Sequence, residues 1–190
     1  MTRKLSEGEK QALLQIARDA ITSKLKDEQL PSIDLTSLSP ALRKKGASFV
    51  TLKKGGMLRG CVGTLEAKKP LVEDVRERAV AAAFQDFRFP PLHPDELSQV
   101  KIEISVLTEA VPVSYRSAAD LVSSLTPGLD GVVLSDGFHR ATFLPQVWDK
   151  FPEPEAFLSR LCAKMGLKEG TWRDRHLDVS LYRVEKFRET

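Results

Sequence analysis

Residues 47–64 read Ala-Ser-Phe-Val-Thr-Leu-Lys-Lys-Gly-Gly-Met-Leu-Arg-Gly-Cys-Val-Gly-Thr, and they hold the clearest fold signal in the chain. Two short apolar runs flank Lys53-Lys54-Gly55-Gly56. Because glycine tolerates the positive φ angles of a tight turn, this pattern predicts a β-hairpin. The second run is unusual for a strand, since it contains Gly60 and Gly63.

The segments on both sides of the hairpin predict helices. Ser6 and Glu9 have the spacing of a capping box, and apolar residues then recur at helical spacing as far as Leu25. Pro70 fits the first turn of a helix that runs to about Phe84, where its missing N–H costs nothing. The proline- and serine-rich residues 29–45 are expected to form a long surface connection.

The rest of the chain intersperses short strands and helices. Residues 100–107 predict a strand with isoleucines on one face and Glu103 on the other. Further expected elements are a helix over 117–125, a hairpin over 131–143, a helix over 154–165 and a last strand over 179–187. Because hairpins rather than regular βαβ crossovers join the strands, we expect an α+β fold with a mostly antiparallel sheet flanked by helices.

Length and composition are those of an ordinary globular protein. The chain has 190 residues, 42% of them hydrophobic and 29% charged, which suits one domain or two small lobes that share a core. The net charge of +3 is too small to indicate nucleic acid or an anionic membrane. Lysine pairs such as Lys53-Lys54 are expected in loops, as solvated turn residues.

Several classes of protein are not expected from this sequence. The longest apolar run, Ala79 to Phe84, is too short to span a bilayer, and the first residues lack the apolar stretch of a signal peptide. The two cysteines and three histidines do not stand at metal-ligand spacing, so we expect no metal site. We therefore expect a soluble cytoplasmic domain that folds without metal or cofactor.

The segment Arg59-Gly60-Cys61-Val62-Gly63 is the first candidate for function. In a regular strand, Arg59 and Cys61 share one face, so the guanidinium would stabilise a Cys61 thiolate. Gly60 and Gly63 leave room for a ligand or a second backbone to approach. The alternative is a small buried cysteine held only for packing, and spacing alone favours this interpretation.

Glu103 is the second candidate. It lies on the strand face opposite the isoleucines. The default interpretation of such alternation is a solvated face of a one-sided sheet. If that face is instead the floor of a functional site, Glu103 would act as a base or hold Arg59.

Two further segments carry candidate binding residues. The stretch 84–91 packs three phenylalanines around Arg88. We expect the phenylalanines of this rigid loop to fill the core, and leave open whether Arg88 binds an anion or a partner peptide. His139 and Arg140 follow the turn of the second hairpin, where a lone histidine is most often solvent-exposed.

These segments resemble the AMMECR-domain family, named after an Alport syndrome, mental retardation, midface hypoplasia and elliptocytosis chromosomal region. Leu58-Arg59-Gly60-Cys61-Val62-Gly63-Thr64 is similar to the family's signature L-R-G-C-I-G-T. Other segments agree in the same order: Phe49-Val50-Thr51-Leu52, Pro70–Val75, Arg88-Phe89-Pro90-Pro91, Gly128-Leu129-Asp130-Gly131 and Arg140–Trp148. One departure is Phe87, where the family commonly has proline.

The resemblance implies a single domain of this type over residues 1–190, with two unequal lobes and a cleft between them. In many prokaryotes such a domain resembles a component of the AmmeMemoRadiSam system, beside a Memo-like protein and a radical S-adenosylmethionine enzyme. Two cysteines cannot supply the triad of an iron–sulfur cluster, so a radical step would belong to a partner.

Three functions follow as hypotheses. The first is a small enzyme or substrate-binding protein with a site around Arg59, Cys61 and Glu103, in which Cys61 and Glu103 are catalytic. The second is a non-catalytic partner that delivers substrate or scaffolds the Memo-like protein and the radical enzyme. The third, a nucleic-acid regulator, has only the small net charge in its favour.

Overall fold

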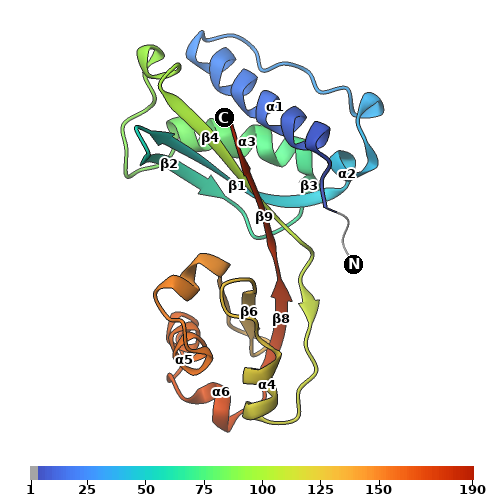
Figure 1. Cartoon of the computed structure of the whole chain (residues 1–190), viewed down its shortest axis with the longest axis vertical. Coiled ribbons are helices and arrows are strands. Elements are labelled where there is room, and N and C mark those ends of the chain that lie inside the picture. The colour runs from blue at the N-terminus through green and yellow to red at the C-terminus, as the bar shows by residue number, and fades with distance from the viewer. Residues whose placement is uncertain (1–3) are drawn as a thin grey trace. The chain divides into compact units, whose positions relative to one another are not determined.

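A computed structural model describes residues 4–190 and shows two compact units. The first unit takes the chain up to Leu107 together with Glu185–Thr190, and the second is Thr108–Val184. Each unit combines helices with one antiparallel sheet, so the expected α+β class is confirmed (Figure 1).

The sheet of the first unit has the strand order β2-β1-β4-β9, with the short β3 paired to β1. Its strands are β1 (Lys45–Lys54), β2 (Met57–Gly63), β3 (Lys69–Pro70), β4 (Val100–Leu107) and β9 (Val184–Arg188). Its helices are α1 (Glu7–Leu25), α2 (Pro40–Arg43), α3 (Leu71–Phe84) and the 3₁₀ turns Leu35–Ser37 and Pro94–Glu96.

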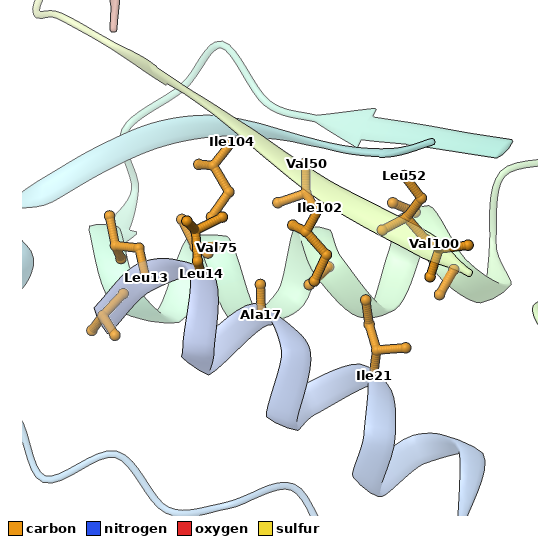
Figure 2. Packing of buried hydrophobic residues seen from close by; sticks show 14 of the residues in the cluster. Leu13, Leu14, Ala17, Ile21, Val50, Leu52, Val75, Val100, Ile102 and Ile104 are labelled. Atoms are coloured by element: carbon orange, nitrogen blue, oxygen red, sulfur yellow. The ribbon is translucent and has the colours of Figure 1, made fainter. Parts of the chain in front are cut away.

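One face of this sheet packs against α1 and α3. Strand residues such as Val50, Ile102 and Ile104 point toward these helices, and Leu13 and Ile21 of α1 lie in the same core (Figure 2). Full burial stabilises each such side chain by about 1.5–3 kcal/mol relative to exposure. Because alternate residues point to opposite faces, the other face carries the polar residues of the same strands.

The predicted local signals set the ends of these elements. Ser6 and Glu9 form the expected capping box at the start of α1. Gly55 and Gly56 turn the β1–β2 hairpin with φ angles of 57° and 80°, which only glycine adopts easily. Lys53 and Lys54, expected in a loop, are the last residues of β1, so the turn is shorter than the sequence suggested.

The sheet of the second unit has the order β5-β8-β6-β7. Its strands are β5 (Val111–Pro112), β6 (Gly131–Ser135), β7 (Arg140–Phe143) and β8 (Asp178–Tyr182), and its helices are α4 (Ala118–Ser124), α5 (Pro154–Lys164), α6 (Thr171–Asp174) and the 3₁₀ turn Pro145–Asp149. Trp148 stacks on Phe157 in its core, with ring centroids 3.8 Å apart. The predicted hairpin and both predicted helices are present.

The expected single strand over 179–187 is wrong, because it is two strands in two different sheets. β8 ends at Tyr182 and β9 begins at Val184. The intervening Arg183 exchanges hydrogen bonds with Thr108: its N–H donates to the Thr108 hydroxyl, and its carbonyl accepts the Thr108 N–H. The residues of 179–187 favour a strand throughout, so the sequence does not show where the chain changes sheets. That point depends on which strands, far apart in the sequence, each half pairs with.

No helix within residues 4–190 is long and apolar enough to cross a membrane.

The Cys162 side chain is part of the second unit's core. It is 0% exposed on α5, and burial raises the pKa of its thiol. We expect Cys162→Ala to cost about 1 kcal/mol of unfolding free energy, as the loss of one buried methyl group does. Native Cys162 should resist a thiol reagent, measured by mass spectrometry with unfolded protein as the control. Rapid labelling of the native thiol would contradict this placement.

Candidate functional site

Three polar side chains form a row across neighbouring strands of the first unit. Thr51 of β1 pairs with Cys61 of β2 on one side and with Glu103 of β4 on the other. Directly paired residues in an antiparallel sheet point to the same face, and here it is the face opposite α1 and α3. We call this the polar face.

The row brings Cys61 and Glu103 to one face but not into contact. Two strand spacings separate their backbones, a distance of about 10 Å. Between them the Thr51 hydroxyl donates a hydrogen bond of 3.2 Å to the Cys61 Sγ. Glu103 is therefore not placed to take a proton directly from the thiol.

Glu103 is held by two lysines. Lys186 Nζ lies 2.8 Å from Oε1, and Lys53 Nζ lies 3.2 Å from Oε2. The residue is 7% exposed, so it is not the solvated side chain that alternation predicts by default. Desolvation opposes ionisation, but the hydrogen bonds from Lys186 and Lys53 outweigh it and hold the pKa of Glu103 below its ordinary value. The carboxyl is thus ionised at neutral pH.

Arg59 does not join this row, which corrects the expected sharing of a face with Cys61. The β1–β2 register shifts between Leu52 and Lys53, so Arg59 is an extra residue opposite no partner. Its guanidinium makes a two-pronged pair with Glu96, at 3.0 and 2.8 Å, and donates to the Pro90 carbonyl. The guanidinium therefore anchors the loop that follows α3.

Arg88 also serves this loop, together with Asp86. Asp86 Oδ2 accepts the Cys61 N–H at 2.8 Å, while Arg88 donates to the Cys61 carbonyl at 3.2 Å. Arg88 also binds the Asp86 carboxylate through two nitrogens, at 2.9 and 2.7 Å. We call these two residues the Asp86–Arg88 clamp, since they grip the outer edge of β2 at Cys61.

The clamp explains why one of the three phenylalanines of this loop does not fill the core as expected, whereas Phe84 does pack against it. Phe87 lies between the two clamp residues and is 97% exposed, so it does not fill the core. With Asp86 and Arg88 both turned toward β2, the side chain between them points away.

The signature glycines are explained by packing within the protein. A Cβ on Gly60 would lie 2.1 Å from the Ala82 carbonyl oxygen of α3, and one on Gly63 would lie 2.2 Å from the Phe49 ring. The glycines were expected to leave room for a ligand or for a second backbone. At Gly60 the backbone of α3 fills this room, and at Gly63 the Phe49 ring fills it.

His139 and Arg140 lie in the second unit, at the start of β7. Asp136 organises their turn: its carboxylate accepts the backbone N–H groups of Phe138 and His139 and also contacts the His139 ring. These bonds lower the pKa of Asp136 to about 2. Both His139 and Arg140 are exposed.

Sequence reasoning missed five residues that build the site: Thr51, Lys53, Asp86, Glu96 and Lys186. Thr51 could not have been found from the turn alone, because an unbroken register would pair it with Gly60, and the bulge at Arg59 moves it opposite Cys61. Lys186 could not, since the end of the chain gave no sign of pairing with β4. Among residues 4–190, no group of three or more His, Cys, Asp or Glu side chains could hold a metal ion.

Comparison with known proteins places this arrangement in a family. The AMMECR1 family model matches residues 14–187, which include the whole sheet row and the clamp. The chain belongs to the AMMECR1 family. A protein of Methanothermobacter thermautotrophicus is 38% identical, with 97% of this chain and 96% of that protein covered. A protein of Thermofilum pendens is also 38% identical, with 98% and 92% covered.

A solved structure supports the same AMMECR1 fold. The crystal structure of the uncharacterised protein PH0010 from Pyrococcus horikoshii matches with a TM-score of 0.76 and 31% identity. The match covers 93% of this chain and 89% of that one.

The Gly60 contact with α3 gives a steric prediction. Gly60→Ala should lower the unfolding free energy by about 1–3 kcal/mol, because neither the strand nor the Ala82 carbonyl can yield without a backbone shift. Gly8→Ala in α1 is the control, since a Cβ there meets nothing within 4 Å. Urea unfolding measures both. A Gly60→Ala protein as stable as wild type would show that the strand is free to move off α3.

The Asp86–Arg88 clamp gives a pH-dependent prediction. The Arg88 side chain, followed by the backbone N–H of Cys61, holds the pKa of Asp86 well below its ordinary 3.8. A lowered folded-state pKa adds stability above the ordinary value, and that stability is lost as pH falls through the folded-state value. Asp86→Asn should therefore cost about 1–3 kcal/mol at neutral pH.

The matched measurement is urea unfolding at pH 7 and pH 3. The deficit of Asp86→Asn should shrink at the lower pH. Glu28→Gln, at an exposed position after α1, serves as the control and should match wild type at neutral pH. An Asp86→Asn deficit that stays constant with pH would rule out the charged clamp as its source.

Proposed function

We propose that this AMMECR1 protein is a substrate-binding component, which holds a small molecule on the polar face of its first sheet while a partner performs the chemistry. The row Cys61–Thr51–Glu103 carries this proposal, because it sets a thiol, a hydroxyl and a carboxylate side by side on three strands. Such a set offers donors and acceptors to a ligand along one line.

The other signature residues support a binding role by elimination. Arg59 anchors the loop after α3, Arg88 grips the β2 edge, and Gly60 admits α3. These roles are internal, and they fix the position of the Cys61 backbone. The side chains left to meet a ligand are those of the polar face.

Binding is favoured over acid–base catalysis by the state of Glu103. A general base works best with a pKa near the working pH, whereas the lysines lower the pKa of Glu103. In the described chain, the hydrogen bond that reaches the Cys61 Sγ comes from the Thr51 hydroxyl, which is a donor.

The partner would be a radical S-adenosylmethionine enzyme acting with a Memo-like protein, as the resemblance to AmmeMemoRadiSam components suggests. Radical chemistry of that kind needs a cluster held by three cysteines, and this chain has two. The division of labour follows: this protein presents the substrate, and the radical enzyme reacts with it.

A nucleophilic Cys61 is a second candidate, which the Thr51 contact favours. The Thr51 hydroxyl donates to the sulfur and holds it in a fixed position on the polar face. Under this alternative, alkylation of Cys61 by iodoacetamide as a function of pH would show enhanced reactivity that Thr51→Val removes. Under the binding proposal, Cys61 reacts as an ordinary thiol and Thr51→Val leaves its rate within about twofold.

The proposal is tested in a reconstituted assembly with the Memo-like protein and the radical enzyme of one organism. Thr51→Tyr places a ring in the middle of the row, away from the helix-side core. We expect it to reduce consumption of S-adenosylmethionine by about tenfold or more, with a Tm within about 2 °C of wild type. Cys61→Ala should retain a measurable fraction of the activity.

Gln15→Tyr, on the exposed side of α1, is the control and should behave as wild type. Full activity of Thr51→Tyr would overturn the proposal. Loss of all activity in Cys61→Ala, with Thr51→Tyr still active, would favour the nucleophile instead.

A further inference from the structure

Four cationic side chains gather at one end of the polar face. Lys53 lies on β1, Lys101 on β4, and Lys186 and Arg188 on β9. Phe187 packs into the helix-side core, so its neighbours Lys186 and Arg188 point to the opposite face. We call this set the cation cluster.

The cluster has a single acid in its middle. Glu103 gives one carboxylate oxygen to Lys186 and the other to Lys53. Lys101 instead donates to a main-chain oxygen of Thr190. The side chains gathered here are therefore four cations and one carboxylate, an excess of positive charge that the net charge of the chain does not reveal.

The pairing of the strands makes this excess costly to the protein alone. Lys53 and Lys101 lie directly opposite each other in the β1–β4 register. Like charges directly opposite each other destabilise a sheet. An anion bound between Lys53 and Lys101 would offset the repulsion between their charges. If the two lysines had only a structural role, this repulsion would remain.

We propose that the cation cluster binds the anionic group, a phosphate or a carboxylate, of the small molecule held on the polar face. This rests on the proposed function and names the chemical class of its ligand. Lys101 and Arg188 meet the anion, while Glu103 holds Lys53 and Lys186 in position beside it. The rest of the ligand lies along Thr51 toward Cys61, about 10 Å from Glu103.

The compactness of the cluster selects a small ligand over a nucleic acid. Its four cations lie on three adjacent strands. Lys53 and Lys101 are directly paired, and Lys186 and Arg188 are two residues apart on β9. Single strands of nucleic acid need a longer charged groove and aromatic side chains for stacking, and Phe49 is the aromatic residue of β1 on this face, where its ring covers Gly63.

Inorganic phosphate and citrate are the two probes, one for each anionic group. Each is titrated into the full-length protein at low ionic strength, with amide chemical shifts as the readout, and sodium chloride at matched ionic strength is the blank. We expect at least one probe to shift the amides of β4 and β9 saturably. The probe that binds more tightly identifies the anionic group.

Variants locate the site. Arg188→Gln and Lys101→Gln should each weaken binding about fivefold, while Lys68→Gln, an exposed lysine outside the cluster, should leave it unchanged. Because both variants lie on the sheet surface, they should keep the wild-type Tm. Equal affinity in wild type and both cluster variants, or no saturable shift with either probe, would overturn the proposal.

The two proposals fail separately. If the anion binds at the cluster but Thr51→Tyr leaves the assembly fully active, the cation site stands and the substrate-binding function falls. If Thr51→Tyr abolishes activity but neither anion binds, the function stands and the cation site falls.

Discussion

The close contact between α3 and β2 is the constraint on which the site depends. The Ala82 carbonyl lies where a side chain of residue 60 would be, so helix and strand meet backbone to backbone. α3 ends at Phe84, two residues after this contact, and the loop after it reaches the strand with Asp86 and Glu96. Those two carboxylates fix Cys61 and Arg59 in turn. The segment Arg59–Gly63 is therefore held in place by the loop that follows α3.

Local pattern predicted much of the fold for identifiable reasons. The hairpin turn required positive φ at Gly55 and Gly56, and alternation correctly placed Glu103 away from the isoleucines. Alternation failed at Arg59, because a bulge depends on what the extra residue can bind, and Glu96 is far along the chain. It also could not show that residues 179–187 change sheets at Arg183.

The candidate site was predicted only in part, since its electrostatics come from distant pairings. Cys61 and Glu103 do lie on one face, but the lysines that pair with Glu103 come from β1 and β9. Their presence changes the chemistry that the carboxylate can perform. A glutamate that is held ionised by two ammonium groups organises charge, whereas a lone buried glutamate would exchange protons. The proposed binding role rests on this arrangement of charge.

The Asp86–Arg88 clamp also bears on how the outer edge of the first sheet is kept from pairing with another chain. β2 is an edge strand, and the Cys61 N–H and carbonyl would otherwise point outward as a template for another chain. A carboxylate and a guanidinium occupy those two groups as a neighbouring strand would. Side chains of the loop after α3 thereby take the place of a further strand at this edge of the sheet. A protein without the clamp would expose the unpaired Cys61 N–H and carbonyl of β2 beside the exposed Phe87 ring. Self-association through this strand edge would then compete with folding.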